Sequence, residues 1–489
     1  MKGRQKTERR KSLADTVFSS LVWKFGERFF AQSVSFVVSV VLARILMPSD
    51  YGVISIVLVF IAFADVFVSS GFGTSLIQKK DATETDFSTI FYCSLVSSVL
   101  VYVILFFCAP LIANFYNMPI LAPVIRIFSL RLPIASYQTV QHAYVSRHMQ
   151  FKKFFFSTLF GTILSGVVGV TLALHGFGVW SLVAQYLTNT VVDALVLSFT
   201  IKWHPKWVFS KKSAKNLMGF GWRVLAADFS GTFFDQLRSI IIGKVYSSAD
   251  LAFYDKGKNL SALLTDNLNA SIMAVLFPAI ANKNDSVQHV KSIARRATST
   301  ISFVLAPVLL GCAAVADTLV LTIYTEKWAE SIPFLQILCL SSLTSIIGSV
   351  ALQVLKARGE GGKILKLEFI KKPVYFVLLI IGIKINVVAV AITMMLYSVY
   401  GTIVNAVTMR KSIGYTLREQ IKDVMPALFM AAIMAISVIL LKFLTINKLL
   451  KLVLQVVVGA GVYLSLSIVS KNKSLDYLTK YLKGRIHRK

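Results

Sequence analysis

Apolar segments of about twenty residues or more recur along almost the whole chain. Of its 489 residues 56% are hydrophobic, and the mean hydropathy is +0.69. A membrane-spanning helix needs about 20 consecutive, mostly apolar residues. The apolar runs here are continuous, whereas the strands of a membrane β-barrel alternate apolar and polar residues. The sequence therefore predicts an all-α polytopic membrane protein.

Fourteen segments are long enough to be membrane spans. They cover residues 18–46, 51–76, 87–112, 122–146, 154–175, 177–201, 216–246, 251–280, 297–324, 332–356, 364–384, 386–409, 424–444 and 450–470. The fourth, seventh and eighth are the least hydrophobic. Pro133 lies inside the fourth, where a proline removes a helical hydrogen bond and favours a kink.

The charges are distributed unevenly between the loops. Lys and Arg number 52 against 23 Asp and Glu, which leaves a formal charge of +29. If the N-terminus is cytoplasmic, most cations lie in the inner loops, while the outer stretches MPSDY and NFYNMP carry none. By the positive-inside rule both termini are cytoplasmic. The same rule accounts for most of the charge, so we expect no nucleic-acid partner.

One inner loop, residues 202–215, mixes Trp203 and Trp207 with lysines. Tryptophan and lysine are enriched where a helix meets the lipid headgroups. We therefore expect this loop to be a cytoplasmic interfacial linker that lies at the headgroups. A patch that recruits phosphate is the alternative interpretation.

The first hairpin, residues 21–73, is echoed about 200 residues later. The paired positions are Trp23-Lys24 with Trp222-Arg223, Ala43-Arg44 with Gly243-Lys244, and Ser49-Asp50 with Ala249-Asp250. Six spans separate the two copies, so both enter the membrane in the same direction, as in transporters built from parallel repeats. Coincidence between similar amphipathic helices is the alternative. A further charged pair, Arg147 with Lys152, matches Arg358 with Lys363 at a spacing of 211.

This repeat predicts two parallel-related six-helix lobes and two additional helices. The expected boundaries are 1–201 for the first lobe, 202–215 for the linker, 216–410 for the second lobe, and 411–489 for the extra helices and basic tail. At the outer end of the first hairpin, Ser49 or Asp50 is expected to cap a tight turn.

Several ionisable residues lie within the predicted spans, where charge is costly and usually functional. The expected substrate-binding cations, which would ring a basic cavity between the lobes, are Lys24, Arg28, Arg44, Arg131, Arg223 and Arg238. The candidates for ion coupling are Asp65, Asp228, Asp235 and Asp266. A basic cavity suits an anion, and arginine binds phosphate through two parallel hydrogen bonds. The alternative is that these groups form structural ion pairs, or that the end-of-span Lys24 and Arg44 extend toward the headgroups.

Catalytic and metal-binding motifs are absent from the sequence. It holds no nucleotide-binding lysine loop, no HExxH and no GxSxG, and its four cysteines have neither metal-ligand nor redox spacing. We therefore expect no enzyme activity, no metal, no cofactor and no direct use of ATP. The candidate acids would allow coupling to an H⁺ or Na⁺ gradient instead.

Two stretches resemble a known family. LARILMPSDYG at 42–52 is similar to the stretch that ends the first helix of bacterial polysaccharide flippases, and QHAYVSRHMQFKK at 141–153 resembles a second stretch at the inner end of their fourth helix. The family is the oligosaccharidyl-lipid flippases of the multidrug/oligosaccharidyl-lipid/polysaccharide exporter superfamily, and the subgroup is like the colanic-acid and teichuronic-acid exporters. The second hairpin departs from the pattern, because YSSAD replaces MPSDY.

The resemblance implies a twelve-helix, two-lobed core plus two helices in the bacterial cytoplasmic (inner) membrane. It implies movement of undecaprenyl-diphosphate-linked oligosaccharide to the outer leaflet by alternating access, for exopolysaccharide or lipopolysaccharide export. The expected partners are this lipid-linked oligosaccharide, membrane lipid, a polysaccharide polymerase and glycosyltransferases, with the protein itself a monomer. Two alternatives remain: a multidrug/cation antiporter of the same superfamily, which would favour an acidic cavity, and a membrane polymerase or ligase, which would need a large outer loop.

Overall fold

The computed structural model describes residues 26, 30–69, 72–79, 81–281, 286–476 and 479, with the side chains of Arg223 and Asp266 outside that description. Within these ranges the chain is helical and contains no strand. Nine of the described helices are long and apolar enough to cross a membrane. The prediction of an all-α polytopic membrane protein is confirmed.

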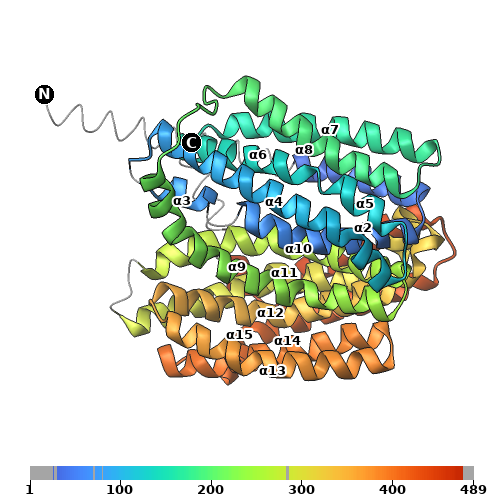
Figure 1. Cartoon of the computed structure of the whole chain (residues 1–489). Coiled ribbons are helices and arrows are strands. Elements are labelled where there is room, and N and C mark those ends of the chain that lie inside the picture. The colour runs from blue at the N-terminus through green and yellow to red at the C-terminus, as the bar shows by residue number, and fades with distance from the viewer. Residues whose placement is uncertain are drawn as a thin grey trace, which may run out of the picture. The chain divides into compact units, whose positions relative to one another are not determined.

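The contacts within the chain divide it into two units, residues 1–252 and 253–489. Within each unit the long helices run roughly parallel to one another (Figure 1). The first unit contains a helix at Phe30–Ile45, α2 (Pro48–Ser69), α3 (Phe72–Gln78), α4 (Glu84–Tyr116), α5 (Leu121–Phe128), α6 (Arg131–Arg147), α7 (Phe151–Leu174), α8 (Val179–Thr200) and α9 (Lys211–Val245). The contacts thus group α9, expected in the second lobe, with the helices before it.

Helix α10 (Ser248–Ala281) begins in the first unit and continues into the second. The second unit then contains α11 (Val287–Ile323), η1 (Glu326–Ser331), α12 (Ile332–Ala357), α13 (Gly361–Ile385), α14 (Val387–Ile413), α15 (Leu417–Leu440), η2 (Leu441–Phe443) and α16 (Lys448–Val469). The predicted extra helices α15 and α16 pack against α11. Arg295 of α11 donates to Asp423 of α15 at 2.7 and 2.8 Å, and the Tyr463 hydroxyl of α16 donates to the Phe303 carbonyl at 2.8 Å.

The described part of each predicted span is helical. The second span is divided between α2 and α3, the thirteenth ends in η2, and the fourth is divided between α5 and α6. The break lies at Ser129 and Leu130, between the two helices. Pro133 has no N–H to donate to the carbonyl of Ser129, four residues earlier, so one continuous helix is interrupted there. The break leaves Arg131 at the first position of α6.

The turns that begin α2 and α10 have the same pattern of hydrogen bonds. A carboxylate oxygen of Asp50 accepts from the Met47 N–H at 3.1 Å, and one of Asp250 accepts from the Ser247 N–H at 3.0 Å. The residue before each of these turns donates to the carbonyl four residues back, 2.8 Å in the first copy and 3.0 Å in the second. The echo at a spacing of 200 is therefore structural, and of the two predicted caps it is Asp50 that closes the turn.

A second turn also recurs, between α6 and α7 and between α12 and α13. Met149 and Gly359 both have positive φ, 54° and 72°. The next residue donates back five positions in each copy, Gln150 to Val145 at 3.0 Å and Glu360 to Leu355 at 2.9 Å. The two turns are 210 residues apart along the chain. The charged pairs on which the sequence comparison rested are 211 apart, so the backbone of the turn and its arginines align one position differently.

The linker at 202–215 is attached to the N-terminal end of α4. The N–H groups of Lys206 and Ser210 donate to the hydroxyls of Ser88 and Thr89, each at 3.1 Å. Trp203 is only 3% exposed and lies in a core cluster with Phe87 and its neighbours, so its ring is covered by the protein itself. Trp207, by contrast, is 95% exposed. The interfacial position of the linker stays a prediction.

Candidate functional site

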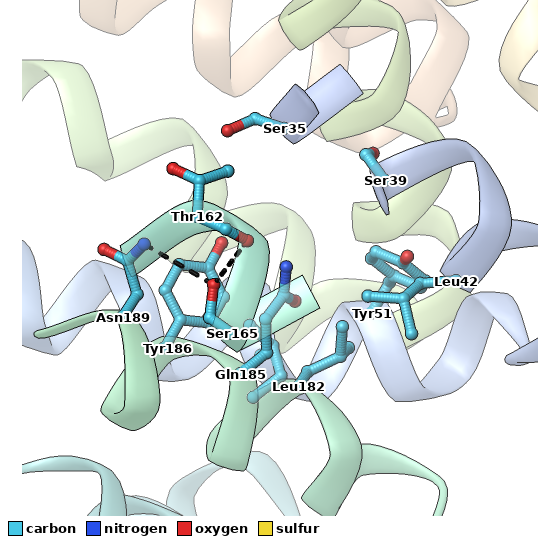
Figure 2. Close-up of a pocket in the computed structure, with 11 residues that line it drawn as sticks. Ser35, Ser39, Leu42, Tyr51, Thr162, Ser165, Leu182, Gln185, Tyr186 and Asn189 are labelled. Carbon is cyan, nitrogen blue, oxygen red and sulfur yellow. Dashed lines mark hydrogen bonds between the residues drawn. The ribbon is translucent and has the colours of Figure 1, made fainter. Parts of the chain in front are cut away.

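The first unit contains a polar cavity of about 330 Å³ between the helix Phe30–Ile45, α2, α7 and α8. Figure 2 shows the side chains that surround it. They are Ser35, Ser39, Leu42, Tyr51, Ile54, Thr162, Ser165, Leu182, Gln185, Tyr186 and Asn189. None carries a formal charge, so the cavity offers hydroxyl, amide and phenol groups to a ligand.

Glycines on α7 bring the walls of this cavity together. A Cβ at Gly161 would lie 3.4 Å from the side chain of Asn189, and one at Gly169 would lie 3.0 Å from that of Gln185. A Cβ at Gly166 would lie 2.5 Å from Val38, which a side chain does not tolerate. Small residues allow membrane helices to approach closely. The spacing of these glycines therefore places the polar side chains of α8 opposite α7.

The polar groups of the cavity are partly satisfied by one another. Asn189 Nδ2 donates to Ser165 Oγ at 3.5 Å, and Ser165 Oγ donates to the Thr162 carbonyl at 3.1 Å (Figure 2). Thr162 donates its hydroxyl to the Thr158 carbonyl at 2.7 Å. Gln185 has no hydrogen bond among the described residues, so its amide remains available. Amides and hydroxyls both donate and accept, which is the pattern that matches a neutral, hydroxyl-rich ligand.

A charged pair lies elsewhere in the same unit. Arg131 Nη2 is 3.4 Å from Asp65 Oδ2, and the guanidinium lies 5.7 Å from the centre of the Phe128 ring. The side chains of the pair remain 21% and 36% exposed. The Arg131 Nε is buried and has no hydrogen-bond partner in the described structure. A predicted substrate-binding cation and a predicted ion-coupling acid are thus brought together, 66 residues apart in the chain.

The other predicted residues have different surroundings. Arg44 is exposed near the end of its helix, and Asp228 and Asp235 lie on an exposed face of α9. Arg238 of α9 is partly buried. Lys24 and Arg28 lie outside the described residues, as do the side chains of Arg223 and Asp266. The basic cavity between the lobes stays a prediction.

Sequence reasoning missed the neutral cavity because it searched for charge. The available signal was polar residues three or four apart inside apolar spans, such as Ser35 with Ser39 and Gln185 with Asn189. It also missed a buried acid between α6 and α8. Asp193 accepts from Gln138 Nε2 at 2.8 Å and lies 3.2 Å from His142 Nε2.

Residues 41–333 match the sequence model of a family described as polysaccharide biosynthesis protein. The succinoglycan biosynthesis transport protein ExoT of Rhizobium meliloti (strain 1021) is 26% identical over 349 residues, 71% of this chain and 70% of the relative. The lipopolysaccharide biosynthesis protein WzxC of Escherichia coli (strain K12) is 24% identical over 418 residues, 84% of each chain. The teichuronic acid biosynthesis protein TuaB of Bacillus subtilis (strain 168) is 24% identical over 300 residues, 61% of this chain and 62% of the relative.

Among solved structures, the lipid II flippase MurJ in an inward closed conformation has a TM-score of 0.74 and 16% identity, covering 92% of this chain and 99% of its own. An inward-facing multidrug resistance MATE family transporter has a TM-score of 0.59, also at 16% identity, covering 80% and 98%. At such identities the likeness shows the fold, which is that of these transporters. The resemblance drawn from the two sequence stretches is confirmed.

Proposed function

Because the chain belongs to the polysaccharide biosynthesis protein family, we propose that it is a flippase for undecaprenyl-diphosphate-linked oligosaccharide. It moves the repeat units to the outer leaflet of the bacterial inner membrane by alternating access, with both termini in the cytoplasm. The names of its relatives support this proposal, since they are proteins of succinoglycan transport and of lipopolysaccharide and teichuronic acid biosynthesis. So does the likeness of its fold to a lipid flippase.

One observation carries the proposal: the uncharged polar cavity among membrane-length helices of the first unit. In lipid, a polar group without a partner is costly, so a cavity lined by hydroxyls and amides needs a polar occupant. Its volume of about 330 Å³ is at the small end of the range for small-molecule sites, ~300–1,000 Å³. A sugar residue of the transported repeat has the matching size and hydrogen-bonding groups. The apolar carrier chain meanwhile remains in the lipid.

The diphosphate of the carrier needs cations, and the described residues that line the cavity include none. We assign this role to Arg28, Arg131, Arg223 and Arg238. Lys24 and Arg44 are assigned to the two ends of the basic cavity. Arg131 Nε has no hydrogen-bond partner among the described residues, and the paired Asp65 is solvent-accessible. A phosphate therefore competes with the Asp65 carboxylate for the same guanidinium. Once released, Asp65 is available for ion coupling, the role also proposed for Asp228, Asp235 and Asp266.

The test is complementation of a strain lacking this gene, with exported polymer and accumulated lipid-linked repeat both measured. Asn189→Leu should lower export strongly, because it replaces the cavity amide with an apolar group of similar size. Thr162→Val and Thr200→Val form a matched pair. Both hydroxyls donate to the carbonyl four residues earlier at 2.7 Å, but Thr162 lines the cavity and Thr200 is exposed.

Export should fall several-fold in Thr162→Val and stay near wild type in Thr200→Val, at equal amounts of membrane protein. Equal export by all three variants would refute a role of the cavity in binding the transported sugar. A deletion strain that accumulates no lipid-linked repeat and exports normally would refute the proposed function itself.

A further inference from the structure

A second polar cavity, of about 260 Å³, lies in the second unit, and unlike the first it contains a cation. It is formed by α10 and α12, and its polar lining consists of Lys258, Ser261, Thr265, Ser341, Ser342 and Ser345. Five hydroxyls thus surround one ammonium group. Lys258 lies in the eighth predicted span, one of the three least hydrophobic.

The cavity begins where α10 and α12 cease to be in tight contact. A Cβ at Gly257 would lie 2.7 Å from the Leu335 nitrogen and 2.8 Å from the Phe334 Cβ. The Tyr254 ring packs edge-on against the Phe334 ring at 5.8 Å. One turn further along α10, the facing residues are Ser261 and Ser342, whose hydroxyl oxygens are 3.3 Å apart. The close crossing fixes the two helices, so the hydroxyls beyond it are held around a space of constant shape.

The charge of Lys258 is not neutralised within the described structure. Its position is about 15 Å along α10 from the first residue of that helix, well inside a predicted span. Two buried lysines of this unit do have compensating contacts: Lys371 is 2.6 Å from Glu368, and Lys256 lies 4.4 Å from the centre of the Tyr324 ring. Lys258 has no such contact among the described residues. A charge at membrane depth without a counter-charge is costly, and binding of an anion removes that cost.

We propose that this cavity is a binding subsite for an oxyanion, with Lys258 as its counter-charge and the serine hydroxyls of α12 as its hydrogen-bond donors. Its volume accommodates a single phosphate or a sugar carboxylate but not a whole repeat unit. The identity of the natural ligand rests on the proposed function: the oxyanion is either the phosphate of the lipid carrier or the carboxylate of an acidic sugar. The existence of the subsite does not depend on that function.

The test is thermal unfolding of the purified full-length protein in detergent, followed by tryptophan fluorescence. Sodium pyrophosphate, sodium glucuronate and glucose are added separately, with sodium chloride as a control of equal ionic strength. A ligand that binds only the folded state raises the unfolding temperature in a saturable manner. Wild type should respond to at least one of the two oxyanions and not to glucose or chloride. Lys258→Gln should weaken that response roughly ten- to hundredfold in apparent Kd, because a hydrogen-bonded charge is lost.

Lys384→Gln is the matched control, since it removes the same charge from an exposed site on α13 of the same unit. It should respond like wild type. If Lys258→Gln does not fold, Ser342→Ala serves instead and should weaken the response several-fold. A response to pyrophosphate alone assigns the carrier phosphate, and a response to glucuronate alone assigns an acidic sugar.

The subsite is refuted if wild type responds to neither oxyanion beyond chloride, or if both Lys258→Gln and Ser342→Ala keep the full response. Export by the wild-type gene, measured separately in the deletion strain, distinguishes this result from failure of the proposed function. If export is normal but no oxyanion raises the unfolding temperature, only the subsite hypothesis is refuted. If export fails but the oxyanion response depends on Lys258, the proposed flippase function is refuted and the subsite is supported.

Discussion

Replacing Gly52 with alanine tests the close approach between the first turns of α2 and α10. Gly52 is buried in α2, and both it and Ser248 belong to the first unit. A Cβ at Gly52 would lie 1.9 Å from the carbonyl oxygen of Ser248 and 2.3 Å from its carbonyl carbon. Because the obstacle is backbone, no side-chain rotation relieves it, and the two segments must separate by about 1 Å. Overpacking of this kind costs about 1–3 kcal/mol, and we expect the upper end.

Gly461→Ala is the matched control. A Cβ at Gly461 in α16 would meet no atom of the described residues within 4 Å, so the same substitution adds a helix-favouring residue without a clash there. Its expected effect is neutral or stabilising, by about 0.5–1 kcal/mol. Thermal unfolding in detergent should therefore show a lower unfolding temperature for Gly52→Ala and an equal or higher one for Gly461→Ala. Equal unfolding temperatures for the two variants would show that the turns do not meet as described.

Three further predictions concern the linker and the loops. Trp203→Ala should lower stability by about 3–5 kcal/mol, because it empties a core position, whereas Trp207→Ala should leave thermal unfolding unchanged. Asp250→Ala should cost about 1 kcal/mol, since it removes the acceptor of the Ser247 N–H, and a variant as stable as wild type would contradict that cap. Burial raises the pKa of Glu360, but hydrogen bonds from neighbouring basic and hydroxyl groups outweigh it and hold the pKa below its usual range. The contribution of ionised Glu360 to the free energy of unfolding is therefore complete above about pH 4.3, its unfolded pKa. It is lost as the pH falls through the lower pKa of the folded state. Glu360→Gln should therefore reduce the fall in unfolding free energy at acid pH, measured by thermal unfolding between about pH 3 and 7.

The parts of the fold that depend on local sequence were predictable. The membrane thickness sets the length of a span, so hydropathy alone located the helices. Asp50 was a candidate cap because its partner, the Met47 N–H, is only three residues away. Even the break in the fourth span follows from Pro133, once the lost hydrogen bond to Ser129 is considered.

The parts that depend on tertiary packing were not predictable. The residues around Trp203 have the composition of an interfacial loop. Its burial results from packing against α4, which the local sequence does not reveal. Arg131 and Asp65 each carried a predicted role, but their pairing joins positions 66 residues apart. The neutral cavity draws its lining from four helices, and no single one of them has an unusual pattern. Shape complementarity between distant segments leaves little trace in one sequence.

The central claim is tested most directly by reconstitution. Purified protein is inserted into liposomes whose inner and outer leaflets contain fluorescent undecaprenyl-diphosphate-linked oligosaccharide, and a membrane-impermeant glycosidase is added outside. Without transport, the enzyme cleaves only the outer half of the labelled lipid. With this protein, the account predicts that cleavage continues toward completion, and that Asn189→Leu slows it. Cleavage that stops at the same fraction with and without the protein, in sealed vesicles under an imposed ion gradient, would contradict the account.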